Sequence, residues 1–530
     1  MLDVVIRNGR IVDGTGNPWF PADLGIQGDR IVVIGNLASA EAERSLDAQG
    51  LVVCPGFIDL HTHSDITLLV NPAADSTVRQ GITTVVVGNC GHSAAPVRNE
   101  LIKSNIIGYR DEFGVDIGWR TLGGYFERLE QQGIAVNVAS LVGHGAIRIA
   151  AMGFAGRQPT ADEMRDMKDL LTQALEEGAM GLSSGLEYTP GKNAKPEELV
   201  ELCRVVAAKG GFYATHTRVR DGEEAIAAMR EAADTAEAAG VPLHLSHITL
   251  RWSVPRGTER ALAMVDELRA RGHDTTCDVV PLTWGPTTMA ATLPAWAFEG
   301  GVARTLERLR DPATRARIKA EKPYFQLQSA GKWDCLMLMY AEKSPEFIGK
   351  TFDEIARLRG LDDPYDAVLD ILLAEGEGFY NVLWMGKNYS EEDGILALRH
   401  PTSSIVSDAI NLAPYGPLAK VRWHPHSYGF IADVFENWVG KKRALSMEEA
   451  VRKLTSAPAL RLGLRQRGLL REGMAADVTV FDPFHIRNNA TYVEPSRYPT
   501  GIEYVLVNGR IVVEKGEHKG VLAGKVLRRN

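Results

Sequence analysis

The chain has 530 residues, which is too many for a single hydrophobic core and predicts two or three domains. Its formal charge is −8, and its lysines and arginines are scattered, which argues against a nucleic-acid partner. Because it has no run of about eighteen apolar residues and no signal-like N-terminus, we expect neither a membrane span nor secretion by that route.

The cysteines are odd in number and far apart, which argues against a disulfide framework and favours a reducing cytoplasm. They are Cys54, Cys90, Cys203, Cys277 and Cys335. Free cysteines are usually buried small hydrophobes. Cys90 stands out because it ends the apolar run TTVVVGNCG between two glycines.

The two ends of the chain echo each other in VVIRNGRIVDG and YVLVNGRIVVE. Asn8-Gly9 and Asn508-Gly509 each predict a type I′ hairpin turn, because that turn needs positive φ at both central residues. We expect residues 1–54 and 468–530 to form one small β-sandwich domain, with two unrelated hairpins as the alternative.

Between the ends, eight short apolar segments alternate with helical ones. Residues 161–178, after the N-cap Thr160, and residues 223–240 both read as helices. This alternation predicts an α/β fold, a (β/α)8 TIM-type barrel over residues 55–467, with a doubly wound open sheet as the alternative. The predicted strands lie in GFIDLHTH, TTVVVGNC, AVNVASLVGH, GAMGLSSGL, GFYATHTR, PLHLSHIT, DTTCDVVPL and SSIVSDA.

The connection between the seventh and eighth predicted strands is long, at roughly 285–402. It contains LPAWAFEGG and charged helical stretches such as VARTLERLRD. A connection of this length normally has structure of its own and often covers the site, so we interpret it as an insertion in the barrel.

Polar residues gather where the predicted strands end, which in such a barrel is the active-site face. His61 and His63 are two residues apart, so on a strand both imidazoles would lie on one face. An isolated pair of this kind is as often a pair of surface histidines. Here later strands add three further metal-binding side chains and a carboxylate, which together predict a transition-metal site. These are Cys90, His216, His247 and Asp408.

The whole chain resembles the amidohydrolase superfamily and, within it, the D-aminoacylase (N-acyl-D-amino-acid deacylase) family. The resemblance rests on PGFIDLHTHSD, VGNCG, VGHGAIR, GLSSGLEYTPG, YATHTR, LSHIT, LPAWAFEGG, the Asp of IVSD, AADVTVFDP and GKVLRR. It implies a tight zinc site formed by Cys90, His216 and His247, and a second, weaker one at His61 and His63. Three protein ligands leave one position for water, as in catalytic zinc sites.

The resemblance also implies roles in catalysis. Asp408 is the expected general base, and its alternative is a helix N-cap at the strand exit. His144 in VGHG is a candidate for stabilising the tetrahedral oxyanion, with a hydrogen-bonded core histidine as its alternative.

The predicted substrate pocket departs from the family pattern. D-aminoacylases hold a free carboxylate with a lysine, an arginine in an HPR motif, and tyrosines. Here the tyrosine of GLxYxP remains, but the lysine position is threonine, HPR has become HPH, and YPY has become VPL followed by a tryptophan. The expected substrate-binding residues are Tyr188, Thr249, Val280, Leu282, Trp284 and His426.

Without two permanent cations a carboxylate would lose its charge-assisted hydrogen bonds. We therefore predict a zinc-dependent hydrolase of a small-molecule amide that is hydrophobic or aromatic and needs no free α-carboxylate. The alternatives are a conventional N-acyl-D-amino-acid deacylase, in which Arg218, Arg220 or Arg251 supplies a displaced cation, and a lactonase, carbamate or cyclic-amide hydrolase. The sequence leaves a homo-oligomer open.

Overall fold

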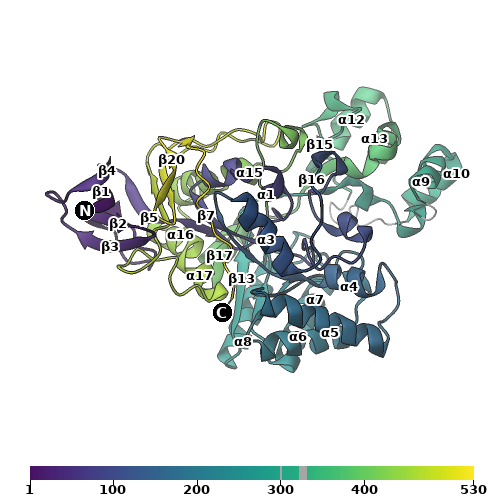
Figure 1. The fold of residues 1–530 in the computed structure, drawn as a ribbon. Helices are drawn as coiled ribbons and strands as arrows, with labels where there is room; N and C mark the ends of the chain where they lie inside the picture. The colour runs from purple at the N-terminus through teal and green to yellow at the C-terminus, as the bar shows by residue number, and fades with distance from the viewer. Residues whose placement is uncertain (299–300, 322–330, 530) are drawn as a thin grey trace.

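The computed structural model describes residues 1–298, 301–321 and 331–529 (Figure 1). Glu299 and Gly300 of the LPAWAFEGG motif, and residues 322–330 of the predicted insertion, lie outside the described residues. Figure 1 shows the strands of both chain ends at one end of the molecule, the parallel strands with their helices in the middle, and helices α9, α10, α12 and α13 at the other end.

Each of the eight apolar segments forms parallel β-structure. One sheet has the order β6-β7-β8, and a six-stranded sheet has the order β17-β13-β12-β11-β10-β9. Their bounds are β6 (Phe57–Asp59), β7 (Ile82–Val87), β8 (Asn137–Ser140), β9 (Val142–Gly143), β10 (Gly181–Gly185), β11 (Phe212–His216), β12 (Leu243–Leu245), β13 (Thr275–Val279) and β17 (Ser403–Ile405). Their residues are almost all buried, as continuous apolar runs predict for parallel strands.

The helices that connect these strands follow their sequence signals. Helix α5 (Ala161–Glu176) begins with a capping box between Thr160 and Glu163, and α7 (Glu224–Ala239) ends at Gly240 in the left-handed conformation. Figure 1 shows α5 to α8 side by side along one flank. The others are α1 (Thr67–Val70), α2 (Asp75–Val78), α3 (Leu122–Gln132), α4 (His144–Met152), α6 (Pro196–Ala208), α8 (Gly257–Ala270) and α14 (Glu391–Arg399). Further helices follow the last parallel strand: α15 (His426–Asp433), α16 (Met447–Leu454) and α17 (Ser456–Leu462).

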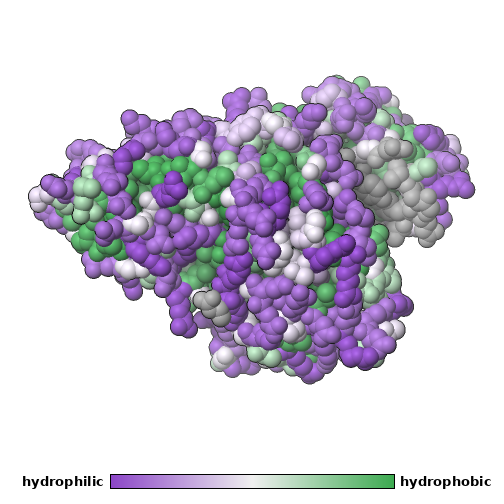
Figure 2. Space-filling view, viewed as in Figure 1, coloured by the Kyte–Doolittle hydropathy of each residue, from purple (hydrophilic) through white to green (hydrophobic). Residues whose placement is uncertain are grey.

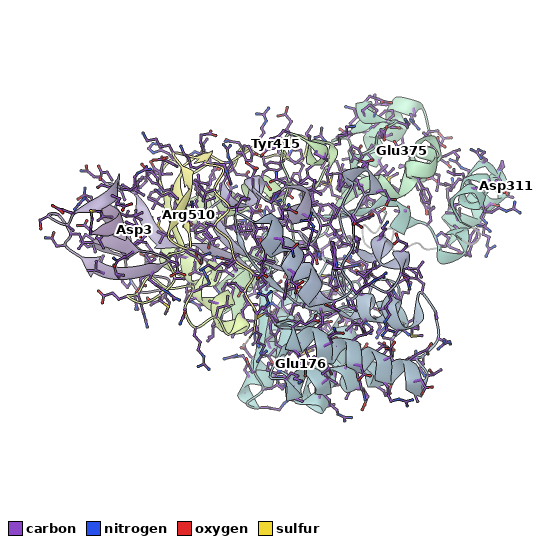
Figure 3. All side chains as sticks on the ribbon, in the orientation of Figure 1. Asp3, Glu176, Asp311, Glu375, Tyr415 and Arg510 are labelled. Carbon is purple, nitrogen blue, oxygen red and sulfur yellow. The ribbon has the colours of Figure 1, made fainter. Side chains whose placement is uncertain are left out.

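The two ends of the chain share one nine-stranded sheet, in the order β21-β20-β19-β18-β5-β1-β2-β3 with β4 beside β1. Its apolar side chains, such as Val4, Ile26 and Leu506, form a separate hydrophobic cluster. Figure 2 shows hydrophobic residues at the surface over this sheet, and Figure 3 places Asp3 and Arg510 on it. The strands are β1 (Leu2–Ile11), β2 (Phe20–Gln27), β3 (Arg30–Gly35), β4 (Ala42–Asp47), β5 (Val52–Pro55), β18 (Val478–Phe481), β19 (Ile502–Val507), β20 (Arg510–Glu514) and β21 (Glu517–His518).

The two Asn-Gly pairs have different outcomes. Asn508-Gly509 joins β19 to β20 with φ of 48° and 79°, as a type I′ turn requires. The hairpin predicted at Asn8-Gly9 is wrong, because both residues lie inside β1. Asn8 has a φ of 59° and the register with β2 shifts there, so the pair forms a bulge.

The segment between β13 and β17 has its own antiparallel sheet, in the order β14-β16-β15, and its own hydrophobic cluster around Phe352, Leu369 and Trp384. Its elements are β14 (Trp284–Thr288), α9 (Gly301–Arg310), α10 (Pro312–Ala320), β15 (Leu336–Tyr340), α12 (Phe352–Arg359), α13 (Pro364–Glu375) and β16 (Leu383–Lys387). Figure 3 labels Asp311 and Glu375 on this part. The domain boundaries themselves stay predictions. Among the described residues no helix has the length and apolarity needed to cross a bilayer.

The turn at Gly509 generates a stability prediction. A Cβ at Gly509 would lie 2.0 Å from the carbonyl oxygen of Gly28, whereas a Cβ at Gly473, with a similar φ of 84°, would meet nothing within 4 Å. Gly473→Ala should cost only the conformational strain, about 1–3 kcal/mol, and Gly509→Ala should cost more because of the added clash. Thermal unfolding of both variants measures the difference, and equal melting temperatures would contradict this account of the turn.

Candidate active site

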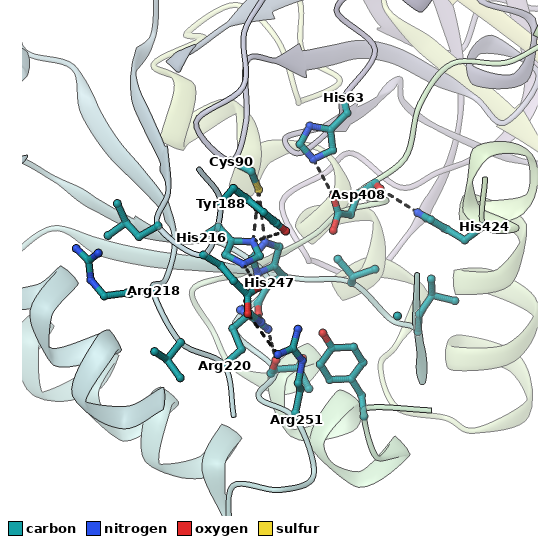
Figure 4. A pocket seen from close by; sticks show the side chains of 18 of the residues that line it. His63, Cys90, Tyr188, His216, Arg218, Arg220, His247, Arg251, Asp408 and His424 are labelled. Carbon is teal, nitrogen blue, oxygen red and sulfur yellow. Dashed lines mark hydrogen bonds and ion pairs between the residues drawn. The ribbon is translucent and has the colours of Figure 1, made fainter. Parts of the chain in front are cut away.

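A cavity of about 630 Å³ opens at the carboxyl ends of the parallel strands, where the sequence places the site (Figure 4). Most of the predicted residues line it: His63, Cys90, Tyr188, His216, His247, Thr249, Val280, Leu282, Trp284 and Asp408. His61 lies behind this wall and is fully buried. The strand-end residues therefore come together from all parts of the chain, as parallel strands require.

The glycines around Cys90 explain its position. Gly88 has a φ of 77°, and a Cβ there would come within 2.0 Å of the carbonyl oxygen of Leu141. A Cβ on Gly185 would come equally close to the carbonyl oxygen of Cys90. The chain can therefore turn tightly after β7 and pack against β10, which brings the thiol to the cavity.

Three imidazole nitrogens surround the sulfur of Cys90. Its Sγ lies 3.2 Å from His61 Nε2, 3.6 Å from His247 Nε2 and 3.8 Å from His216 Nδ1. The four side chains are buried and come from four different strand ends. A thiolate and imidazoles in this arrangement are the donor set that zinc prefers. The residues present therefore fit a zinc ion.

A second group of donors shares His61 with the first. Oδ1 of Asp408 lies 3.1 Å from Nε2 of His63 and 3.5 Å from Nε2 of His61. The donor atoms of His61, His63 and Asp408 all lie within 4.8 Å of one another, as do those of His61, Cys90 and His247. The two groups are adjacent, which suits two neighbouring metal positions.

The surroundings favour the charged forms of the two acids. Burial raises the pKa of the Cys90 thiol, but the imidazoles of His61, His216 and His247 outweigh it and bring the pKa well below its usual range. Burial likewise raises the pKa of Asp408, but the neighbouring His61 and His63 outweigh this effect and lower the pKa to about 2. The thiolate is the form that binds metal, and the carboxylate is the form that accepts a proton.

Three of these residues have an unusual backbone conformation. The φ angles of Cys90, His247 and Asp408 are 51°, 37° and 54°. Such values are uncommon outside glycine and cluster at functional sites, where the surrounding structure enforces them. The chain therefore accepts strain at the points where these three side chains enter the cavity.

Comparison with known proteins decides the family. Residues 44–322 and 396–513 match the model of the amidohydrolase family. The chain is 34% identical to N-acyl-D-glutamate deacylase and 32% identical to D-aminoacylase, both of Alcaligenes xylosoxydans xylosoxydans, over 100% of this chain and 97% and 98% of theirs. The crystal structure of N-acyl-D-glutamate deacylase from Bordetella bronchiseptica, complexed with zinc and a phosphonate inhibitor, superimposes with a TM-score of 0.80 at 31% identity and full coverage of both chains.

The chain belongs to the amidohydrolase family. The expectation of a hydrolase of this family is thereby confirmed.

Sequence reasoning missed the acidic residues that contact the predicted histidine ligands of this amidohydrolase on the ring nitrogen that faces away from Cys90. Glu187 Oε2 accepts a hydrogen bond from His216 Nε2 at 2.8 Å, which turns Nδ1 of that ring towards Cys90. Asp278 contacts His61 in the same way, at 3.2 Å from Nδ1. The available signals were an acid beside Tyr188 in GLEYTP and an acid inside the buried strand TTCDV.

Arg220 supports a third ligand. Its guanidinium lies 2.9 Å from Nδ1 of His247 and donates to the carbonyl oxygens of His247 and Thr249. Through the two carbonyl oxygens Arg220 fixes the main chain on both sides of Ile248, and with it the turn that carries the His247 ring.

Two predicted residues do not reach the cavity of the amidohydrolase. His144 is the first residue of α4, and its ring is buried against Glu198 at 2.7 Å, close to Arg148. His426 is the first residue of α15 and packs inside the protein near Asp433. Both helices begin at the histidine itself, which directs its side chain into helix packing. His424 lines the cavity instead and donates to the carbonyl oxygen of Asp408 at 2.9 Å.

The position of Cys90 generates a test. Cys90→Ala should abolish stable metal binding and activity while leaving the fold intact, because the side chain is small and its main partners are the histidine rings. Metal analysis after dialysis and circular dichroism measure the two effects. Cys203→Ala is the matched control, since that thiol is also buried but belongs to α6 and does not line the cavity. Full metal content in Cys90→Ala would contradict the assignment.

Proposed function

We propose that this amidohydrolase is a zinc-dependent hydrolase of amide (N-acyl) bonds whose substrate is hydrophobic or aromatic and needs no free α-carboxylate. The observation that carries the proposal is the cavity wall, whose arginines are all engaged by protein groups. The relatives named deacylases support the bond that is cleaved.

The proposal includes a scaffold, a closed (β/α)8 barrel with the segment near 285–402 inserted and the chain ends in a separate β domain. Two features support closure. Only Leu141 separates β8, the last strand of the β6-β7-β8 sheet, from β9, the edge strand of the six-stranded sheet, so the two sheets are continuous at that edge. At the other edge the amide of Asp408 donates to the carbonyl of His61 at 3.0 Å, and the amide of His63 donates to the carbonyl of Ala409 at 2.8 Å.

Five residues would hold zinc. Cys90, His216 and His247 form the predicted tight position, and His61 and His63 the second. When bound, zinc supplies a Lewis acid that polarises the scissile carbonyl and makes water acidic enough to attack at neutral pH.

The remaining chemistry belongs to the side chains. Asp408 is ionised and faces the same space as His63, so it can take a proton from the attacking water and deliver it to the departing nitrogen. His424 fixes the main chain of Asp408 through its carbonyl oxygen. Tyr188, whose hydroxyl lies 3.4 Å from His216 Nδ1, stands where it can donate to the substrate carbonyl.

The arginines of the cavity wall are held in protein interactions. Arg218 pairs with Glu231 at 2.7 Å, and Arg251 pairs with Asp221 at 2.6 Å and lies 3.4 Å from Glu187. Arg220 uses its guanidinium on the carbonyls described above. A substrate carboxylate would have to compete with the acids for these arginines, and breaking the largely buried Arg251–Asp221 pair would cost about 3–5 kcal/mol if a charge were left uncompensated.

The rest of the wall suits an uncharged substituent. Val280, Leu282 and Trp284 line one side, and Ile107 and Leu186 add further apolar surface. The buried hydroxyl of Thr249 has no hydrogen-bond partner among the described residues, so it is free to meet a neutral polar group. This wall favours a hydrophobic or aromatic amide.

A conventional N-acyl-D-amino-acid deacylase is the second candidate, and one observation favours it. Lys192 lines the cavity with an exposed side chain, and no carboxylate within the described residues pairs with it. Its ammonium could bind a substrate carboxylate at the rim.

Substrate preference separates the two candidates. N-acetylphenethylamine and N-acetyl-D-phenylalanine differ only by the carboxylate, and we expect at least a tenfold higher kcat/KM for the neutral amide. Thr249→Lys should restore a charge-assisted hydrogen bond worth about 1.5–3 kcal/mol, raising kcat/KM for the acid about tenfold or more. A wild-type preference for the acid that Lys192→Met abolishes would support the conventional deacylase and sink the first candidate.

The role of Asp408 predicts a loss of rate without a loss of metal. Asp408→Asn should lower kcat by about 10²- to 10⁴-fold, because the amide cannot accept the proton from water. Zinc content should stay near that of the wild type, because none of the three tight ligands is changed. Removing zinc with a chelator should abolish wild-type activity reversibly. An active Asp408→Asn enzyme would exclude the residue as the general base.

A further inference from the structure

One buried carboxylate outside the cavity contacts both predicted metal positions. Asp278 lies in β13 with an exposed fraction of 1%, and it does not line the cavity. Its Oδ2 is 3.2 Å from His61 Nδ1 and 3.0 Å from His244 Nε2, and its Oδ1 accepts from the main-chain amide of His247. Burying a carboxylate is costly unless it is hydrogen-bonded, and here three donors surround it, which indicates a specific structural or functional role.

We propose that Asp278 is a positioning residue that sets the donor atoms of both metal positions at once. It would do so by fixing the tautomer of His61 through one oxygen and the backbone turn of His247 through the other. The inference rests on the zinc centre proposed above.

The contact with His61 decides which nitrogen is free. A carboxylate only accepts hydrogen bonds, so Nδ1 of His61 must carry the proton. The lone pair then lies on Nε2, the atom that faces both Cys90 at 3.2 Å and Asp408 at 3.5 Å. The carboxylate thus makes the ring ready to bind metal through Nε2, as such partners do in histidine metal sites.

The contact with His247 supports a strained turn. His247 has a φ of 37°, a value that non-glycine residues rarely adopt, and its amide donates to Asp278 Oδ1. The next amide, of Ile248, donates to the main-chain oxygen of Asp278 at 2.8 Å. Side chain and main chain of one residue therefore hold the turn that brings the His247 ring to the sulfur.

His244 completes the set of donors around the carboxylate. Its Nε2 donates to Asp278 Oδ2, and its Nδ1 lies 2.8 Å from the hydroxyl of Thr276. Neither residue lines the cavity. These contacts keep the carboxylate in one orientation, so that each oxygen has a fixed task.

Asp278→Asn is the decisive variant, because asparagine has the same size as aspartate but carries an NH2 donor in place of one acceptor oxygen. Its Oδ1 can still accept from the amide of His247, which leaves Nδ2 facing His61 Nδ1. That arrangement favours the wrong tautomer, with the proton on Nε2. Asp278→Ala instead leaves space for water, which can accept from Nδ1. Tautomer control therefore predicts that Asn impairs metal binding at least as much as Ala, whereas a purely packing role predicts that Ala is worse and Asn is near wild type.

The measurements are chelator-buffered Zn²⁺ titration of the whole protein, the Co²⁺–thiolate absorption band, and the melting temperature of the zinc-free protein. We expect Asp278→Asn to weaken zinc binding about 10- to 100-fold and to alter the Co²⁺ band, with a melting temperature close to that of the wild type. Asp433→Asn is the matched control, since that carboxylate also faces a histidine, His426, and neither residue lines the cavity or contacts a predicted metal ligand. It should titrate like the wild type.

Two outcomes would overturn the role of Asp278. One is an Asp278→Asn protein with wild-type zinc affinity and Co²⁺ spectrum. The other is Asp278→Ala clearly weaker than Asp278→Asn, with affinity tracking the melting temperature. Failure of the proposed function looks different, because then the wild type itself would bind no zinc or cleave no amide.

Discussion

The site depends on one constraint: parallel strands bring their carboxyl ends to the same edge, but a side chain enters the space between them only if the chain turns at once. Cys90, His247 and Asp408 make that turn with a left-handed backbone. The glycines beside Cys90 allow the same turn without a clash. The packing of the strands and helices around these residues stabilises the fold enough to offset the free-energy cost of this local backbone strain.

Around this turn the protein balances buried charge. Three of the predicted histidine ligands have a partner behind them: Asp278 behind His61, Glu187 behind His216, and Arg220 behind His247. The two acids fix ring orientation and tautomer, and leaving a buried charged group without its partner is costly. Acids also hold Arg218 and Arg251, and in the proposed function these pairs keep both arginines from binding a substrate carboxylate. Because Glu187 contacts both His216 and Arg251, the proposed ligand geometry and the proposed substrate preference are linked through one side chain.

Much of this arrangement could be predicted from the sequence, because apolar strands and metal-binding side chains leave local patterns. Strand ends such as HTH and NCG were visible for that reason. Asp278 and Glu187 were not, because a supporting acid has no fixed spacing from the ligand it contacts. His144 and His426 were misplaced because helices α4 and α15 begin at them and turn their rings into the core. Asn8-Gly9 failed because pairing of β1 with β2 continues past it.

The sheet shared by the two chain ends delays strand pairing during synthesis of the chain. Strand β5 pairs with β1 on one side and with β18 on the other, and the amide of Leu527 donates to the carbonyl of Val138 in β8. When β5 leaves the ribosome, its partner β18 is more than four hundred residues from being made. A nascent chain therefore exposes the edges of β5 and β8 until β18 and the segment around Leu527 have been made. Chaperones that bind exposed strand edges would therefore have to protect these two strands for the longest time during synthesis.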